Sequence, residues 1–204
     1  MKEYMPRTFD YLQGLPGFSK ETVRMHLTLY QGYVDNTNLL AELMRDSLRT
    51  GTSGAVEWKE LKRRFAWEFN GMRLHEYYFE NLTPTPTLMG PLSPVRRKID
   101  EDFGGYDLWE RGFKGTGAIR GVGWVILVFD TQTGRLFNVW LDEHDAGLLV
   151  GTYPLLVMDV FEHAFLLDYG LKRQEYVEAF FKVINWKMVE ERLEACLKPQ
   201  LRPV

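Results

Sequence analysis

The spacing of hydrophobic residues predicts two long helices in the first half of the chain. A turn at residues 15–18 is followed by Ser19, a favourable helix N-cap, and large apolar and aromatic residues then recur at helical spacing. This helix should stop near the glycine-rich turn at 51–54, and a second helical pattern runs from about residue 56 to residue 81. Two long helices joined by so short a turn predict an antiparallel hairpin.

The pattern changes after the proline-rich segment 83–87, which cannot continue a helix. The pair Ser93-Pro94 predicts the start of a new helix. Residues 121–129 and 135–141 are rich in Val, Ile, Phe and Trp and flank a turn, so they predict a β-hairpin. Residues 155–158 predict a third strand, and helical patterns close the chain.

Together these elements predict an α+β fold. A long N-terminal α-helical hairpin should be followed by an α/β lobe with a small three-stranded antiparallel sheet. We expect the linker at 83–87 to separate two domains, a helical-hairpin domain at 1–86 and an α+β domain at 87–204.

Composition and charge narrow the class of protein. With 45% hydrophobic and 26% charged residues, the chain has the balance of a globular protein and not of a disordered one. Its formal net charge of −3 argues against nucleic-acid binding by phosphate neutralisation. No apolar run is long enough to span a bilayer and none follows the first residues, so we expect no membrane segment, no secretory signal and a cytoplasmic location. A single cysteine, Cys196, excludes an internal disulfide.

The four histidines are the main candidates for chemistry. His26 and His75 fall on the two predicted helices, on faces that are otherwise apolar and aromatic, and His163 lies four residues after Asp159 at the end of the third strand. Two imidazoles from a helix pair and a carboxylate–imidazole pair would form a site suited to iron, manganese or zinc. A histidine on an apolar face is more often a hydrogen-bonded core residue, so spacing alone leaves both interpretations open.

Five segments of the chain, in order, resemble the iron/manganese superoxide dismutases. The C-terminal one, MDVFEHAFLLDY at 158–169, is similar to the family's signature. The others are SKET at 19–22 with the histidine that follows, HEYYF at 75–79, GVGW at 121–124 and NW at 185–186. The resemblance covers roughly residues 15–197.

This resemblance implies an enzyme that converts two superoxide anions to oxygen and hydrogen peroxide at one metal ion between the lobes. The protein ligands would be His26, His75, Asp159 and His163. The implied cofactor is one iron per subunit, with manganese or either metal as the alternative. The implied partners are superoxide and a second copy of the chain in a homodimer, with a tetramer as the alternative, and neither nucleic acid nor a membrane.

Other residues take roles from the same resemblance. Tyr33, at the substrate gateway, and His144, hydrogen-bonded to metal-bound solvent, would be the catalytic residues, and Glu162 would lie at the dimer interface. The residues around the pocket would be Tyr78, Trp124, Phe161 and Arg173.

The chain also departs from the family pattern. Phe161 replaces a tryptophan, Leu166 replaces a tyrosine, and the stretch from His26 to Tyr33 is one residue shorter than in the commonest members. These changes leave the ligand set intact and alter the gateway. Two alternative functions therefore remain: another mononuclear non-haem iron enzyme of oxygenase type, and a metal-binding dimer without turnover.

Overall fold

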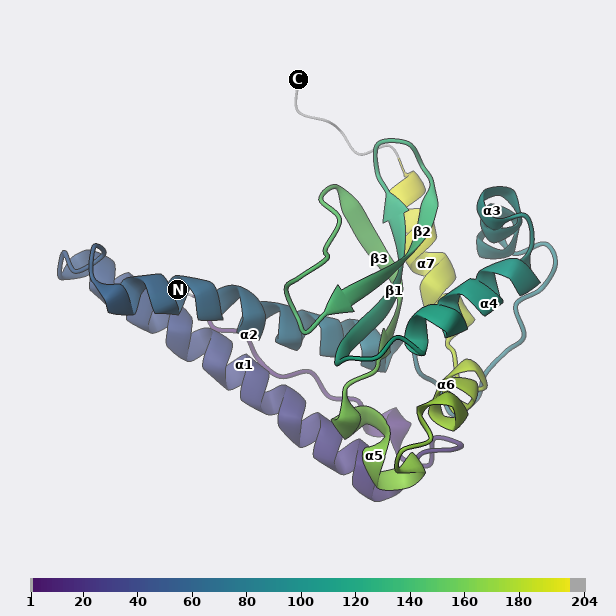
Figure 1. The fold of residues 1–204 in the computed structure, drawn as a ribbon, viewed down its shortest axis with the longest axis horizontal. Helices are drawn as coiled ribbons and strands as arrows, with labels where there is room; N and C mark the ends of the chain where they lie inside the picture. The colour runs from purple at the N-terminus through teal and green to yellow at the C-terminus, as the bar shows by residue number, and fades with distance from the viewer. Residues whose placement is uncertain (1, 199–204) are drawn as a thin grey trace.

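The computed structural model describes residues 2–198 and joins a long helical hairpin to a lobe built around one sheet (Figure 1). Along the chain the elements are η1 (Asp10–Leu12), α1 (Lys20–Arg49), α2 (Val56–Glu80), α3 (Pro94–Phe103), α4 (Tyr106–Gly117), β1 (Gly123–Asp130), β2 (Leu136–Asp142), β3 (Thr152–Asp159), α5 (Glu162–Tyr169), α6 (Arg173–Phe181) and α7 (Trp186–Leu197). The predicted α+β class is confirmed. The division into domains at 1–86 and 87–204 stays a prediction, and residue 1 and residues 199–204 lie outside the described part.

The helical hairpin forms where the sequence predicts it. The side chain of Ser19 accepts a hydrogen bond from the Thr22 N–H and so caps the start of α1. From there α1 is continuous to its end, without a bulge. α1 and α2 pack together along the hairpin, whose tip projects beyond the rest of the molecule (Figure 1). Each helix thus carries one of the two candidate histidines into the same interface.

The sheet has three antiparallel strands in the order β2-β1-β3, as predicted. The central strand, β1, is buried along almost its whole length. In its register Trp124 pairs with both Leu141 of β2 and Asp159 of β3. The third strand is longer than the predicted 155–158, because edge residues with little apolar pattern also pair with β1.

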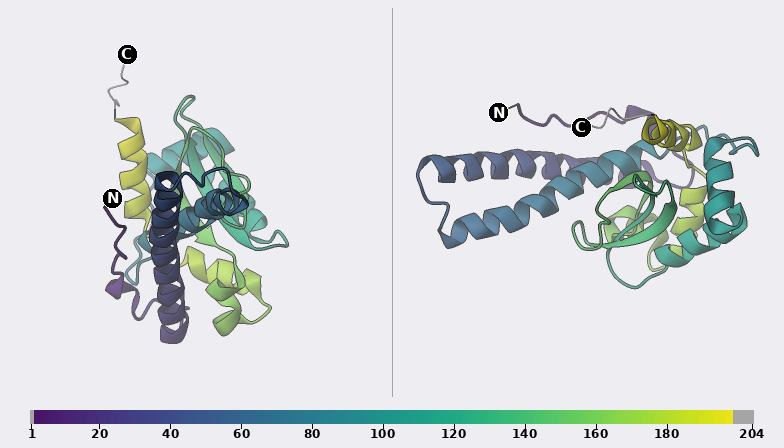
Figure 2. Two further views of the ribbon diagram at one scale, coloured as in Figure 1. Left: turned by 90° about the vertical axis from the view of Figure 1, so that its left-hand side faces the viewer. Right: turned by 90° about the horizontal axis from the view of Figure 1, so that it is seen from above.

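Helices cover the sheet, and the end of the sheet that carries Asp159 lies against the helical hairpin. α4 packs against β1 and β2, whereas α2 and α7 pack against β3, so that the sheet lies between α7 and α4 (Figure 2). α5, which the sequence pattern did not predict as a helix, packs beside the N-terminal end of α1 (Figure 1). This contact places the segment from Asp159 to His163 against the helical hairpin. None of the helices in residues 2–198 combines the length and apolarity needed to cross a bilayer.

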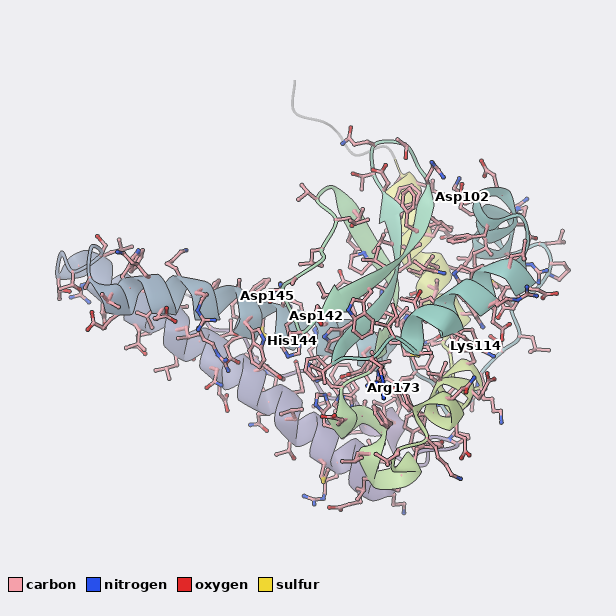
Figure 3. The ribbon with its side chains drawn as sticks, in the orientation of Figure 1. Asp102, Lys114, Asp142, His144, Asp145 and Arg173 are labelled. Carbon is pink, nitrogen blue, oxygen red and sulfur yellow. The ribbon has the colours of Figure 1, made fainter. Side chains whose placement is uncertain are left out.

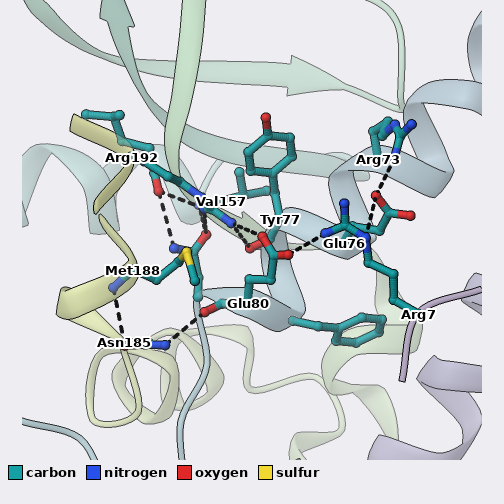
Figure 4. Close-up of polar contacts among 12 residues, drawn as sticks. Arg7, Arg73, Glu76, Tyr77, Glu80, Val157, Asn185, Met188 and Arg192 are labelled. Carbon is teal, nitrogen blue, oxygen red and sulfur yellow. Dashed lines mark hydrogen bonds and ion pairs between the residues drawn. The ribbon is translucent and has the colours of Figure 1, made fainter. Parts of the chain in front are cut away.

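A buried arginine ties the end of α2 to the second lobe. Arg192 of α7 donates hydrogen bonds to the side chain of Asn81 and to the carbonyls of Leu155 and Tyr77, and it forms an ion pair with Glu80 at 2.7 Å (Figure 4). Only 5% of Arg192 is exposed. The arginine therefore links the C-terminal end of α2 to β3 and α7, and removing one partner would leave a buried charge uncompensated.

Candidate metal centre

Four side chains from four elements converge between the hairpin and the sheet. They are His26 of α1, His75 of α2, Asp159 at the end of β3 and His163 in the first turn of α5, and one ligand atom from each lies within 4.8 Å of the others. The Oδ2 atom of Asp159 is 3.2 Å from His26 Nε2, 3.0 Å from His163 Nε2 and 3.6 Å from His75 Nε2. The three Nε2 atoms therefore surround one carboxylate oxygen, and His163 alone of the four is partly exposed.

The protonation of His75 tests whether this cluster fits a metal ion. Its Nδ1 lies 2.6 Å from the carbonyl of Gly71, so the ring hydrogen is on Nδ1 and the lone pair is on Nε2. Burial lowers the pKa of His75 well below its usual value, which keeps the ring neutral. The Nε2 atom is buried, has no hydrogen-bond partner and faces a carboxylate oxygen. A buried lone pair in that position fits a cation, and a nitrogen and oxygen donor set suits iron or manganese.

Asp159 is held as an ionised group by its surroundings. Burial works to raise its pKa, but the charge of His163 and hydrogen bonds from His163 and His26 outweigh burial and hold the pKa well below its usual range. The second carboxylate oxygen accepts a hydrogen bond from the Phe161 N–H at 2.8 Å. The buried hydroxyl of Tyr176 donates to the Asp159 carbonyl at 2.5 Å, so backbone and side chain are both fixed.

A polar contact beside the cluster sets the register of the two ligand-bearing helices. The Tyr30 hydroxyl of α1 donates to Glu76 of α2 at 3.0 Å. Tyr30 follows His26 by one helical turn, and Glu76 directly follows His75. Glu76 is buried and also accepts from Arg73 at 2.7 Å (Figure 4). The two histidines are thereby held at a fixed relative height along the hairpin.

A chain of three side chains extends from the cluster to β1. Trp124 Nε1–H donates to His144 Nδ1 at 3.0 Å, so Nδ1 carries no hydrogen. Burial lowers the pKa of His144 to about 4, which keeps the ring neutral and places its hydrogen on Nε2. This Nε2–H donates to the Tyr33 hydroxyl oxygen at 2.8 Å. Tyr33 therefore accepts from His144 and keeps its own hydroxyl hydrogen free for a further acceptor.

Aromatic rings enclose the cluster. The ring centroids of Tyr78 and His26 are 5.1 Å apart, and those of Trp124 and His75 are 5.0 Å apart. Phe161 stacks on His163 at 5.2 Å and on His144 at 4.7 Å. Three of the four predicted pocket residues thus lie against the histidines, and Phe161 contributes ring surface without the N–H of a tryptophan.

The predicted residues Arg173 and Glu162 lie outside this cluster. Arg173 lies at the start of α6 (Figure 3). It donates to the carbonyls of Ile119 and Gly121, each at 2.7 Å. It lines a surface cleft of about 1090 Å³ together with Glu162. The guanidinium thus braces the loop before β1 instead of reaching the ligand atoms. Glu162 is exposed and forms no ion pair within residues 2–198.

Some supporting residues could not be found from the sequence patterns. Tyr176 was placed only in a helical pattern, and Trp67 and Asn70 of α2 read as ordinary helix positions. In the structure Trp67 packs on Tyr33 and His144, and Asn70 donates to the His144 carbonyl. Their positions in the helical pattern give no sign of these contacts.

A helical hairpin and an α+β lobe that share three imidazoles and one carboxylate define a mononuclear metalloprotein. Comparison with known proteins identifies the family of metalloproteins. The family model described as "Iron/manganese superoxide dismutases, C-terminal domain" matches residues 91–192. The chain belongs to the iron/manganese superoxide dismutase family.

Relatives that match along nearly the whole chain agree with this assignment. A superoxide dismutase (Fe) of Aquifex pyrophilus is 39% identical over 191 residues, covering 91% of this chain and 89% of the relative. Superoxide dismutase (Mn) 2 of Haloferax volcanii is 32% identical over 195 residues, covering 95% of both. A superoxide dismutase (Fe) of Methanothermobacter thermautotrophicus is 31% identical over 196 residues, covering 95% of this chain and 94% of the relative.

Proposed function

We infer that this chain is a superoxide dismutase, and that His26, His75, Asp159 and His163 are the protein ligands of its metal ion. The observation that carries the proposal is the buried, unpartnered Nε2 of His75, which faces the Asp159 carboxylate among two further imidazoles. Membership of the iron/manganese superoxide dismutase family supplies the reaction, in which two superoxide anions yield oxygen and hydrogen peroxide. The bound metal supplies the one-electron chemistry, because iron and manganese both alternate between two oxidation states.

The chain's own residues then have distinct tasks. Around a bound metal, the Asp159 carboxylate would add negative charge to the three imidazole ligands, which would favour the higher oxidation state. Tyr33 holds a proton beside the ligands: its ring stacks on that of His75 at 5.0 Å, and burial raises its pKa above the usual value and keeps the hydroxyl protonated. The Nε2–H of His144 bonds to the Tyr33 oxygen, so the Tyr33 hydrogen points elsewhere and can serve the reduced substrate. Tyr78, Trp124 and Phe161 limit the space beside the ligands to a small molecule.

For the metal we propose iron, with manganese or either metal as the alternative. The relatives above carry both metals in their names, and the ligand set suits both ions. Protein stripped of metal should be reloaded separately with iron and with manganese, and bound metal and dismutation should be measured for each. Activity with iron alone supports the proposal, and activity with manganese selects the alternative. Full occupancy with each metal in turn and no dismutation with either one would overturn the proposed function.

A homodimer is part of the proposal, with a tetramer as the alternative. α5 presents the exposed side chains of Leu166 and Leu167 beside Glu162, and Leu29 of the neighbouring α1 is also exposed. A second copy would cover this apolar surface, and Glu162 would pair with the partner subunit's His163. A cytoplasmic location and an antioxidant role remain predictions of the same proposal, to be tested by fractionation of cells and by deletion of the gene.

Sedimentation velocity tests the dimer. Glu162→Ala should weaken it, because the partner histidine would lose its acceptor. Glu194→Ala, on an exposed position of α7, is the matched control and should leave the sedimentation coefficient unchanged. Unaltered association of Glu162→Ala would contradict the proposed role of Glu162.

A further inference from the structure

The indole of Trp67 makes contacts that neither the ligand set nor the family assignment explains. Its ring centroid is 4.4 Å from that of His144 and 5.5 Å from that of Tyr33. Its Nε1–H donates to the Glu143 carboxylate at 2.9 Å. One side chain of α2 therefore touches both members of the His144–Tyr33 pair and the residue that precedes His144.

Glu143 has an unusual backbone conformation at that position. Its φ is 47°, and it is the only residue other than glycine with a positive φ in residues 2–198. The left-handed region brings the Cβ of an ordinary residue too close to the carbonyl oxygen, so surrounding contacts must hold it. The turn is closed by hydrogen bonds between the backbones of Asp142 and Ala146, and the Glu143 N–H donates to the Val122 carbonyl. His144 projects from the middle of this strained turn.

A second side chain of α2 bonds to the same turn. Asn70, three residues after Trp67 on the same helix face, donates from Nδ2 to the His144 carbonyl at 2.9 Å. α2 thus holds two consecutive residues of the turn, Glu143 through its carboxylate and His144 through its backbone. Figure 3 shows His144 beside α2, between Asp142 and Asp145 of the segment that leaves β2.

The orientation of Trp67 is itself fixed from the solvent side. The Arg64 guanidinium lies 3.9 Å from the centroid of the indole ring, and Arg64 is ion-paired with the buried Glu68 at 2.7 Å. The indole is therefore packed between a cation on one side and the His144–Tyr33 pair on the other. A side chain constrained in this way has little rotamer freedom to lose when it hydrogen-bonds to Glu143.

We propose that Trp67 is a positioning residue for His144, acting through the hydrogen bond from its indole N–H to Glu143. This contact holds the left-handed turn, and the turn aims His144 Nε2 at the Tyr33 hydroxyl. The proposal rests on the role of Tyr33 and His144 given above and is independent of the ligand set. It assigns a task to Trp67 and Glu143 that hydrophobic packing alone would not require.

The test uses Trp67→Phe, which keeps an aromatic ring but loses the N–H, and Glu143→Ala, which loses the acceptor. Hydrogen exchange of the amides of residues 142–147, read by mass spectrometry on metal-loaded protein, should become about threefold faster in both variants, as expected for loss of one exposed charge-assisted hydrogen bond. The midpoint potential of the bound metal should shift in both. Glu143→Gln retains an acceptor oxygen, so its exchange rate at residues 142–147 and the midpoint potential of its metal should match those of the wild type.

Two controls separate the contact from general effects on α2. Trp58→Phe alters a tryptophan of the same helix that contacts Lys62 rather than the site, and it should leave exchange at 142–147 unchanged. In the double variant Trp67→Phe/Glu143→Ala, exchange should be no faster than in either single variant, because both changes remove the same bond. Additive effects, or exchange at the wild-type rate in both single variants, would overturn the proposal.

The same measurements distinguish this proposal from the proposed function. Exchange and metal content are read without any dismutation assay. If the wild-type protein fails to dismutate superoxide, the function fails while the exchange result still decides the role of Trp67. If the variants exchange at the wild-type rate in an active enzyme, Trp67 loses its positioning role and the function stands.

Discussion

His144 Nε2 lies 2.8 Å from the Tyr33 hydroxyl, although the two residues are 111 positions apart in the chain. The Trp124 N–H on the other ring nitrogen of His144 makes Nε2 the donor in this contact. The direction matters because it leaves the Tyr33 hydrogen unused within the pair. A tyrosine that accepts from one side can donate on the other, toward the ligand cluster.

Tyr33→Phe tests this arrangement. The variant keeps the ring and removes the oxygen, so His144 Nε2–H loses its acceptor in a buried position. Metal content should stay at the wild-type level, and dismutation should fall by roughly tenfold, the effect of about 1.4 kcal/mol in the transition state. Tyr11→Phe is the matched control, because the Tyr11 hydroxyl bonds to the backbone carbonyl of Phe79 and to none of the four ligands. Wild-type activity of Tyr33→Phe would remove this hydroxyl from the reaction.

His75→Ala should abolish stable metal binding. Its side chain offers a buried neutral nitrogen with no other partner, so its loss opens one position of the donor set. Bound metal should be measured by mass spectrometry after dialysis against a chelator. His144→Ala is the comparison, since it leaves the four ligand atoms in place and should retain metal while its midpoint potential changes. Normal metal content in His75→Ala would refute the ligand assignment.

Metal removal should also lower thermal stability. A ligand that binds only the folded state stabilises it by about 4 kcal/mol at a thousandfold excess over its Kd, and for a chain of this size that corresponds to about 10 °C in Tm. Calorimetry with and without a chelator measures the shift. The His75→Ala protein should melt at the same temperature in both conditions, and an equal chelator effect in that variant would show that the stabilising ion binds elsewhere.

The sequence predicted the frame of this site well because the frame depends on regular patterns. The helical hairpin, the N-cap at Ser19 and the antiparallel sheet follow from periodicity and turn residues, which act locally. The resemblance to a known family selected His26, His75, Asp159 and His163, and the structure brings these four together. Spacing alone could not do so, because an apolar helix face accepts a core histidine as readily as a ligand.

The supporting residues could not be predicted, because their roles arise from tertiary contacts. Nothing in the pattern around Trp67 indicates that its N–H reaches Glu143, 76 positions later. The helical pattern alone gives no reason for a glycine at position 71. The structure explains why position 71 is a glycine. A Cβ built there would lie 2.6 Å from Cδ1 of the Tyr33 ring.

Gly71→Ala should therefore destabilise the protein and displace Tyr33. The added methyl group overlaps a ring held on its other side by His144, and overpacking of this kind costs about 1–3 kcal/mol. Gly32→Ala is a matched control in α1, where a Cβ meets nothing within 4 Å. That change should stabilise the protein by up to about 1 kcal/mol, the usual helix preference of alanine over glycine. Urea unfolding measures both, and a neutral Gly71→Ala would contradict the packing argument.

Stability at alkaline pH should depend on the half-buried tyrosines. Tyr106 is one of them, and its ring packs on Trp109 and Trp186 rather than on a ligand residue. Burial, followed by the charge of Glu110 and offset by Arg96, raises its pKa from 10.0 to about 12. The folded state thus holds the phenol proton more tightly than the unfolded state. The stability that this provides is fully present below pH 10 and is lost as the pH rises through 12. Because the group is partly exposed, we expect about 1 kcal/mol from it.

Tyr106→Phe isolates that contribution. The variant keeps the ring contacts with Trp109 and Trp186 and cannot ionise. Free energies of unfolding in urea should be compared at pH 8 and pH 11. From pH 8 to pH 11, the free energy of unfolding should fall by about 1 kcal/mol less in the variant than in the wild type. The reason is that only the wild-type chain loses stability by ionising this phenol on unfolding. An equal difference between the two proteins at both pH values would show that Tyr106 titrates alike in the folded and unfolded chain.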